Sequence, residues 1–177
     1  MIRGKRVVIR AVREGDLSNL FSLHNDVSLR GAEPSLGLIS AVEFQKVYRE
    51  DGFLGKNKGQ LVVADHDDRI IGYVSYFTVG LIDGFELAYC LFDVAARGTG
   101  VMTEALRLVI THLFDSHKIN RLQIATLPSN ESSRRLALRC GFRLEGTLRG
   151  SYFHRGKNED VLLFSLLRAE HEASQLG

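Results

Sequence analysis

The segment at residues 95–106 constrains this chain more than any other part of its sequence. Gly98 and Gly100 follow an apolar, strand-like run at residues 87–94 and precede a segment whose apolar residues recur at helical spacing. A glycine turn at the start of a helix presents backbone N–H groups that have no partner within the helix, and the helix dipole favours negative charge there. The segment therefore predicts a strand, a phosphate-binding turn and a helix.

Three kinds of nucleotide site contain a Gly-x-Gly turn, and the sequence excludes two of them. A dinucleotide-binding fingerprint has a third glycine three positions after the second, where this chain has Thr103. A mononucleotide P-loop has Gly-Lys-Ser or Gly-Lys-Thr, which does not occur at this turn. The diphosphate of coenzyme A is the remaining ligand of this type.

The whole chain is typical of one globular domain. Its 177 residues are enough to bury a substantial core, and no repeat or proline-rich linker divides them. We expect a single domain over residues 1–177, with a polar tail from about residue 168. Because no apolar run is long enough for a bilayer or typical of a signal peptide, we expect a cytoplasmic protein without membrane contact. Cys90 and Cys140 are interpreted as packing residues.

Hydrophobic periodicity and turn residues predict the order of elements. Strands are expected at residues 6–12 (at an edge of the sheet), 61–64, 70–79, 85–92, 121–127, 142–153 and 161–167. Helices are expected at residues 14–26, 40–51, 100–115 and 128–140, loops at 27–39 and 51–60, and a frayed end after residue 168. Ser40 is expected to cap the second helix. This order predicts an α+β fold with a central mixed, mostly antiparallel sheet of about six to seven strands flanked by helices.

A second motif follows the glycine turn along the chain. It begins with Asn130-x-x-Ser133 and continues with Gly141-Phe142, Glu145-Gly146 and, later, Asp160-Val161-Leu162. The turn itself, Arg97-Gly98-Thr99-Gly100-Val101-Met102, is similar to a Gln/Arg-x-x-Gly-x-Gly/Ala motif. In this order the two motifs resemble the GNAT superfamily of acyl-CoA-dependent N-acetyltransferases. The combination looks like the branch that contains ribosomal-protein alanine acetyltransferases.

The resemblance implies transfer of an acetyl group from acetyl-CoA, without a metal, to a primary amine. The α-amine of a protein or peptide, attacking directly in a ternary complex, is the first interpretation, and a small amine (polyamine, amino acid or aminoglycoside) is the alternative. A third interpretation is a non-catalytic acyl-CoA-binding module, because many relatives carry a tyrosine general acid where this chain has Ala137. Met102 also departs from the family's Gly/Ala.

The resemblance implies a set of residues that bind acetyl-CoA. Backbone N–H groups of the turn would hold the diphosphate, at Gly98, Thr99, Gly100, Val101, Met102 and Thr103, and Arg97 would also bind the cofactor. The strand ending near Phe92 and the strand at residues 121–127 would splay, so that the pantetheine arm pairs with their free backbone groups. A backbone N–H at Leu91 or Phe92 would polarise the thioester oxygen. Asn130 would orient the arm, and Arg135 and Arg139, which share a helix face, would contact the cofactor.

Two side chains are candidates for the chemistry of transfer. Glu86 is the candidate general base, acting through water, and its alternative interpretation is an outward-facing strand carboxylate. Ser133 is the candidate proton donor to the leaving sulfur, and its alternative interpretation is a serine that only begins a helix. An α-amine, with a pKa near ~8, needs less help from a base than a lysine-type amine near ~10.4.

The segment at residues 134–157 is rich in arginine. It is interpreted either as a basic rim that meets phosphates or an acidic acceptor, or as a solvated helix face. Because aromatic residues are not interleaved with its arginines and no known reading motif is present, we do not expect a nucleic acid as partner. The sheet edges and the final strands are compatible with a homodimer.

Overall fold

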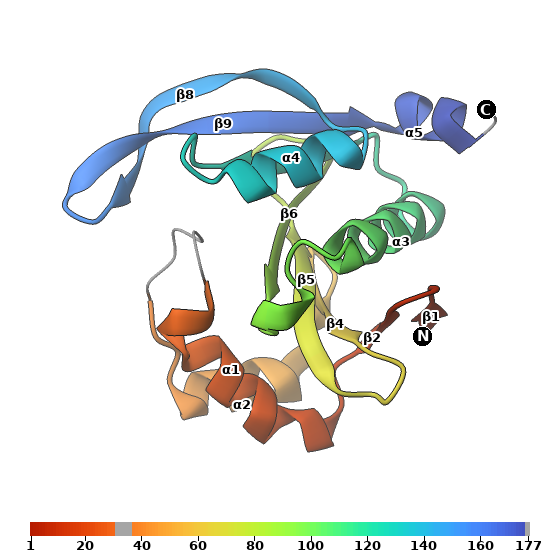
Figure 1. Ribbon diagram of the computed structural model, residues 1–177, viewed down its shortest axis with the longest axis vertical. Helices are drawn as coiled ribbons and strands as arrows, with labels where there is room; N and C mark the ends of the chain where they lie inside the picture. The colour runs from red at the N-terminus through yellow and green to blue at the C-terminus, as the bar shows by residue number, and fades with distance from the viewer. Residues whose placement is uncertain (31–36, 176–177) are drawn as a thin grey trace.

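The computed structural model describes residues 1–30 and 37–175, which form a nine-stranded sheet with helices on both faces (Figure 1). Hydrogen bonds join the strands in the order β1-β2-β4-β5-β6-β7-β9-β8, and β3 pairs with β4. The strands are β1 (Ile2–Arg3), β2 (Val8–Ala11), β3 (Leu54–Gly55), β4 (Lys58–Ala64), β5 (Ile70–Phe77), β6 (Gly84–Leu91), β7 (Arg121–Thr126), β8 (Arg143–His154) and β9 (Lys157–Leu167). Every neighbouring pair is antiparallel except β6 and β7, which run parallel.

Two hydrophobic cores lie on opposite faces of this sheet. The helices are α1 (Leu17–Asn25), α2 (Ala41–Asp51), α3 (Val101–Ser116), α4 (Glu131–Arg139) and α5 (Arg168–Gln175), with short 3-10 turns at Glu14–Asp16, Val27–Arg30 and Val94–Ala96. Because side chains alternate along a strand, Phe85 and Leu87 of β6 pack in the core with α3 and α4, whereas Cys90 packs in the core with α1 and α2. No helix among the described residues is long and apolar enough to span a bilayer.

The predicted fold class is confirmed, but the sheet has more strands than expected. The two extra strands, β1 and β3, are two residues long each, too short for any hydrophobic alternation to show in the sequence. The predicted loop at residues 51–60 was wrong, because β3 turns back on β4 within it. The predicted edge position of the first long strand was also wrong, since β2 pairs with β1 on one side and β4 on the other.

Three further predictions concern a helix cap, the C-terminal end of the chain and the loop after α1. Ser40 caps α2 as predicted, accepting a hydrogen bond from the Glu43 N–H. The expected frayed end instead forms α5, because the Arg168 guanidinium donates hydrogen bonds to the carbonyls of His117 and Ile119. Of the loop expected at residues 27–39, residues 27–30 form a 3-10 turn, and residues 31–36 lie outside the described residues.

A buried arginine joins β2 to the first helical turn. The Arg10 side chain, with only 3% of its surface exposed, contacts Asp16 at 2.6 Å and Asp68 at 2.7 Å. Burial of Asp16 opposes its ionisation, but hydrogen bonds from the Arg10 side chain and the Arg13 backbone outweigh it, so the pKa of Asp16 is lowered. A carboxylate of this kind stabilises the fold above its unfolded pKa, and the contribution disappears as pH falls through its folded pKa.

We therefore expect Arg10→Ala to lower the free energy of unfolding by about 3 kcal/mol at pH 7, because it leaves a partly buried carboxylate without its partner. Urea denaturation measures the change. The exposed Arg49 of α2 offers a control, and Arg49→Ala should change stability by less than about 0.5 kcal/mol. The effect of Arg10→Ala should begin to shrink as the pH falls below about 4, where Asp16 of the unfolded chain takes up a proton, and should be lost as the pH falls through the lowered pKa of folded Asp16. A loss that is independent of pH in this range would contradict the assignment.

Candidate active site

The site is centred where β6 and β7 separate. The two strands pair only from Gly84–Arg121 to Glu86–Gln123, while β6 stays paired with β5 as far as Leu91. The splay predicted for these strands is therefore present. Beyond Leu87, backbone groups of β6 that point away from β5 have no partner strand.

Hydrogen bonding at the end of β6 identifies which groups face this gap. The Phe92 N–H donates to the Ile71 carbonyl at 2.9 Å. Backbone groups alternate sides along an antiparallel strand, so the odd-numbered residues of β6 face β7. The N–H of Leu87 completes the last bridge to β7, at Glu86–Gln123, and the N–H groups of Tyr89 and Leu91 point into the gap beyond it. The Leu91 N–H therefore fits the predicted donor to a thioester oxygen. The prediction for Phe92 does not fit, because its N–H is already paired and its side chain lies in the core on the other face.

The glycine turn leads from β6 into α3. Gly98 and Gly100 have φ values of 75° and 88°, a backbone conformation that side chains with a Cβ adopt only with strain. Gly100 is the N-cap of α3, and the first helical hydrogen bond from the N–H of Glu104 returns to the Gly100 carbonyl. The preceding N–H groups of the first turn thus remain available to a ligand. The turn has the geometry expected of an anion site.

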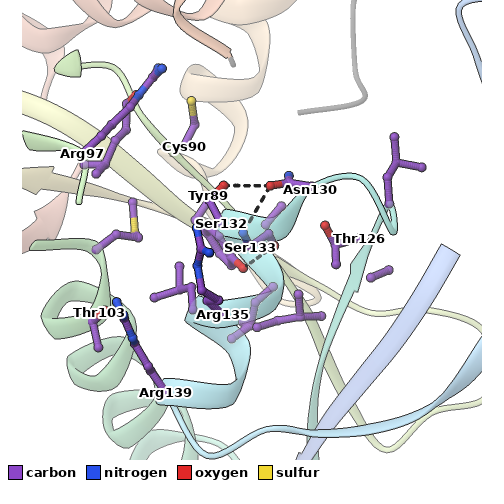
Figure 2. Close-up of a pocket in the computed structure, with 18 of the residues that line it drawn as sticks. Tyr89, Cys90, Arg97, Thr103, Thr126, Asn130, Ser132, Ser133, Arg135 and Arg139 are labelled. Atoms are coloured by element: carbon purple, nitrogen blue, oxygen red, sulfur yellow. Dashed lines mark hydrogen bonds between the residues drawn. The ribbon is translucent and has the colours of Figure 1, made fainter. Parts of the chain in front are cut away.

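A cavity of about 490 Å³ connects the gap with the glycine turn, and Figure 2 shows its lining. It lies between β6, β7, α3 and α4, and its volume is in the range of small-molecule sites. The predicted residues that line it are Glu86, Leu91, Arg97, Gly98, Gly100, Met102, Thr103, Asn130, Ser133, Arg135 and Arg139. Thr99, Val101 and Phe92 are not part of the lining.

The N-terminus of α4 forms one wall of this cavity. Asn130 caps the helix, and its Oδ1 accepts hydrogen bonds from the Ser133 N–H at 3.2 Å and the Ser132 hydroxyl at 2.8 Å. This capping holds Ser133 at the cavity wall, where its residue is only 9% exposed. Ala137 is fully buried in the core, so its position on α4 offers nothing to the cavity.

The opposite wall contributes a residue that sequence reasoning missed. The Tyr89 hydroxyl of β6 lies 2.8 Å from the Ser133 Oγ. Burial raises the pKa of Tyr89 to about 12, so the phenol stays protonated at neutral pH. In the sequence Tyr89 is one of several alternating apolar or aromatic residues, and only the splay of β7 reveals that it faces a cavity.

The three predicted arginines differ in their contacts. Arg97 donates to the carbonyls of Leu29 and Leu91, and so ties the glycine turn to the end of β6. Arg135 forms an exposed i, i+4 pair with Glu131, whereas Arg139 has no ion pair among the described residues. The positive charge of Arg139 at the cavity therefore remains unneutralised.

A second hollow, of about 660 Å³, lies on the opposite face of the sheet beneath the β8–β9 hairpin. Its lining includes Gln123, Leu163 and Leu167, which point away from the α3 core. Glu86 and Ala125 border both this hollow and the main cavity. The two spaces therefore approach each other at the point where β6 and β7 separate.

The carboxylates around the second hollow have different partners. Hydrogen bonds from Arg121 and Ser165 hold the pKa of Glu145 at about 2, so this carboxylate is ionised and neutralises Arg121. Glu86 accepts a hydrogen bond from the Gln123 amide at 2.7 Å and pairs with no cationic side chain of the described residues. Among the described residues, the Glu86 carboxylate therefore contacts an amide and no cation at the point where the two spaces approach each other.

Cys90 and Cys140 are both buried, no disulfide joins them, and burial raises the pKa of Cys140 to about 11. This agrees with packing roles. Within residues 1–30 and 37–175, no group of three or more histidine, cysteine or acidic side chains is arranged to hold a metal ion.

Comparison with known proteins gives consistent matches. The family model described as Acetyltransferase (GNAT) domain matches residues 6–143. A Bacillus subtilis (strain 168) protein described as the probable N-acetyltransferase YjcK is 27% identical over 97% of this chain and 99% of its own. The ribosomal-protein-serine acetyltransferase of Escherichia coli (strain K12) is 32% identical over 56% of this chain and 55% of its own. The crystal structure of spermidine N-acetyltransferase from Vibrio cholerae, in complex with CoA and spermine, superposes with a TM-score of 0.84 at 19% identity, covering 96% and 99% of the two chains.

Proposed function

The chain belongs to the GNAT acetyltransferase family, and we propose that it transfers the acetyl group of acetyl-CoA to the α-amine of a protein or peptide. The observation that carries this proposal is the early separation of β6 from β7, which leaves a cavity leading from the glycine turn to Glu86. In this proposal the diphosphate binds the free N–H groups from Gly98 to Thr103. The pantetheine arm then pairs with the unpartnered backbone of β6, as an added strand would.

Each step of the proposed transfer has a candidate group in the site. Glu86, acting through water, accepts a proton from the amine as its nitrogen bonds to the thioester carbon. The Leu91 N–H stabilises the negative charge on the thioester oxygen. As the C–S bond breaks, its electron pair moves to sulfur, and the Ser133 hydroxyl donates a hydrogen bond to it. The proton released by the amine balances the one that converts the thiolate to free CoA thiol.

Direct attack within a ternary complex is preferred to an acetyl-cysteine intermediate. Cys140 does not line the cavity, and burial keeps it as a thiol rather than a nucleophilic thiolate, since its pKa is about 11. Cys90 borders the cavity, but it is buried in the core with α1 and α2. The second hollow gives an acceptor its own approach to Glu86, from the face opposite the main cavity. Donor and acceptor would then occupy the site together.

An α-amine is favoured as the acceptor for two reasons. Its ordinary pKa near ~8 leaves a useful neutral fraction at pH 7, whereas a polyamine is held as a cation of higher pKa. The E. coli relative named above acetylates a ribosomal protein, according to its name. Over the aligned residues it is 32% identical to this chain. The fold of the V. cholerae spermidine enzyme supports the alternative, a small amine. An acyl-CoA-binding module without catalysis is less favoured, because Glu86 and Ser133 both line the cavity.

A panel of acceptors with thiol release as the readout tests the proposal. We expect release of CoA with a lysine-free peptide that has a free N-terminus, and little release with an N-acetylated peptide that offers only lysine. Spermidine and an aminoglycoside complete the panel. Turnover with spermidine alone would replace the α-amine by the small-amine alternative. Tight binding of acetyl-CoA by calorimetry, with no turnover on any amine, would favour the non-catalytic module.

A further inference from the structure

We propose that Tyr89 is a positioning residue for acetyl transfer: it donates a hydrogen bond to Ser133, and thereby directs the Ser133 proton at the departing sulfur. The proposal rests on the proposed function. Tyr89 extends from the part of β6 that has left β7, and Ser133 from the first turn of α4. Their hydroxyl oxygens lie 2.8 Å apart, and both residues line the same cavity. Figure 2 labels the two side chains.

The chemistry of the two hydroxyls determines the direction of this hydrogen bond. Each group has one proton to donate and lone pairs to accept with. A phenol is a stronger acid than an alcohol, and its oxygen is a weaker acceptor because a lone pair is delocalised into the ring. Donation from Tyr89 to Ser133 is therefore the favoured order. In this order the Ser133 proton is left to point at a third atom, whereas the reverse order would leave Ser133 nothing to donate.

The residues around Ser133 also restrict the direction in which its hydroxyl proton can point. Its N–H is held by the Asn130 cap, and its residue is 9% exposed. Of the described residues, Tyr89 is the one whose side chain contacts the Ser133 hydroxyl in a hydrogen bond. With the backbone and the oxygen both fixed, the remaining direction for the proton is into the cavity. Once the pantetheine arm excludes water, the sulfur is the expected acceptor.

This arrangement also explains how the site works with Ala137 in place of an α4 tyrosine. Ala137 is buried, so the phenol comes from β6 on the other side of the cavity. Tyr89 stays protonated during the reaction, because burial raises its pKa to about 12. The Ser133 hydrogen bond stabilises the thiolate while the C–S bond breaks. The thiolate is then protonated to the CoA thiol, and the proton released by the amine balances this uptake.

Tyr89→Phe tests the proposal with two acetyl donors. With acetyl-CoA we expect kcat to fall about tenfold and the KM for acetyl-CoA to change less than about twofold, since one hydrogen bond made mainly in the transition state is lost. Acetyl-selenocoenzyme A is the second donor, because its selenolate is a much weaker base and needs less stabilisation. With this donor we expect the loss in kcat to shrink to less than about twofold.

Three controls keep the test decisive. Ser133→Ala should show the same dependence on donor, and the double variant should lose no more than the larger single loss, because both groups act as one unit. Tyr76→Phe removes the hydroxyl of a buried tyrosine on β5 outside the cavity and should keep the wild-type kcat. Melting temperatures check that each variant folds. Equal losses with both donors, additive losses, or a change in KM alone would overturn the role of Tyr89. Absence of transfer by the wild-type protein would instead reject the proposed function, and this inference with it.

Discussion

Replacing Glu86 by glutamine is expected to lower kcat by about 10²- to 10⁴-fold, the range typical of losing a general base. Glutamine has nearly the same shape, so it can still contact the Gln123 amide, which now donates to Glu86 at 2.7 Å. It cannot take a proton from the attacking amine or from a bridging water. Steady-state rates of CoA release at saturating acetyl-CoA measure the effect, and calorimetry should show that acetyl-CoA still binds.

The control for this substitution is Glu50→Gln on α2. Glu50 is an exposed carboxylate that faces Lys46 at 3.9 Å, and its change should leave kcat within about twofold of wild type. If Glu86→Gln reduced kcat less than about threefold, Glu86 would return to the alternative interpretation, an outward-facing strand carboxylate. A large increase in KM for the amine with unchanged kcat would assign Glu86 to binding the acceptor rather than to proton transfer.

The fold was predictable where local signals are long and agree with each other. The strands β4 to β7 have apolar runs bounded by turn residues, and α3 has both a glycine start and regular apolar spacing. The failures are elements held by backbone or side-chain contacts that no periodicity records. β3 forms because Leu54 and Gly55 pair with the start of β4. α5 forms because Arg168 donates hydrogen bonds to two carbonyls that are about fifty residues away in the sequence.

The residues of the candidate site likewise divide into those that local sequence patterns predict and those that depend on strand pairing. The glycine turn and the Asn130–Ser133 helix start are local patterns, so the sequence could place them, and the structure brings them to one cavity. Tyr89 could not be found, because its role depends on the separation of β7, which is distant in the sequence. Phe92 was predicted wrongly for a related reason. Only the register with β5 shows that its N–H is paired and that the N–H of Leu91 is the one facing the gap.

The second large effect is expected from Gly98→Ala, which should weaken acetyl-CoA binding by about 10- to 100-fold, or about 1.4–2.8 kcal/mol. Gly98 has a φ of 75°, and an added Cβ would meet no atom within 4 Å. The substitution therefore acts through the backbone, whose left-handed conformation costs an alanine about 1–2 kcal/mol. A turn that relaxes to relieve this strain no longer directs its N–H groups at a diphosphate. Calorimetric titration with acetyl-CoA and with CoA measures the change.

Gly52→Ala is a closely matched control for this prediction. Gly52 follows α2, has a φ of 62°, and also has open space around an added Cβ. Both variants should lose a similar amount of stability, but only Gly98→Ala should lose affinity, because Gly52 lies outside the lining of the cavity. Wild-type affinity in both variants, each of them folded, would show that the glycine turn does not hold the diphosphate. A matched loss in both would show that general destabilisation, rather than the lost geometry of the turn, weakens binding.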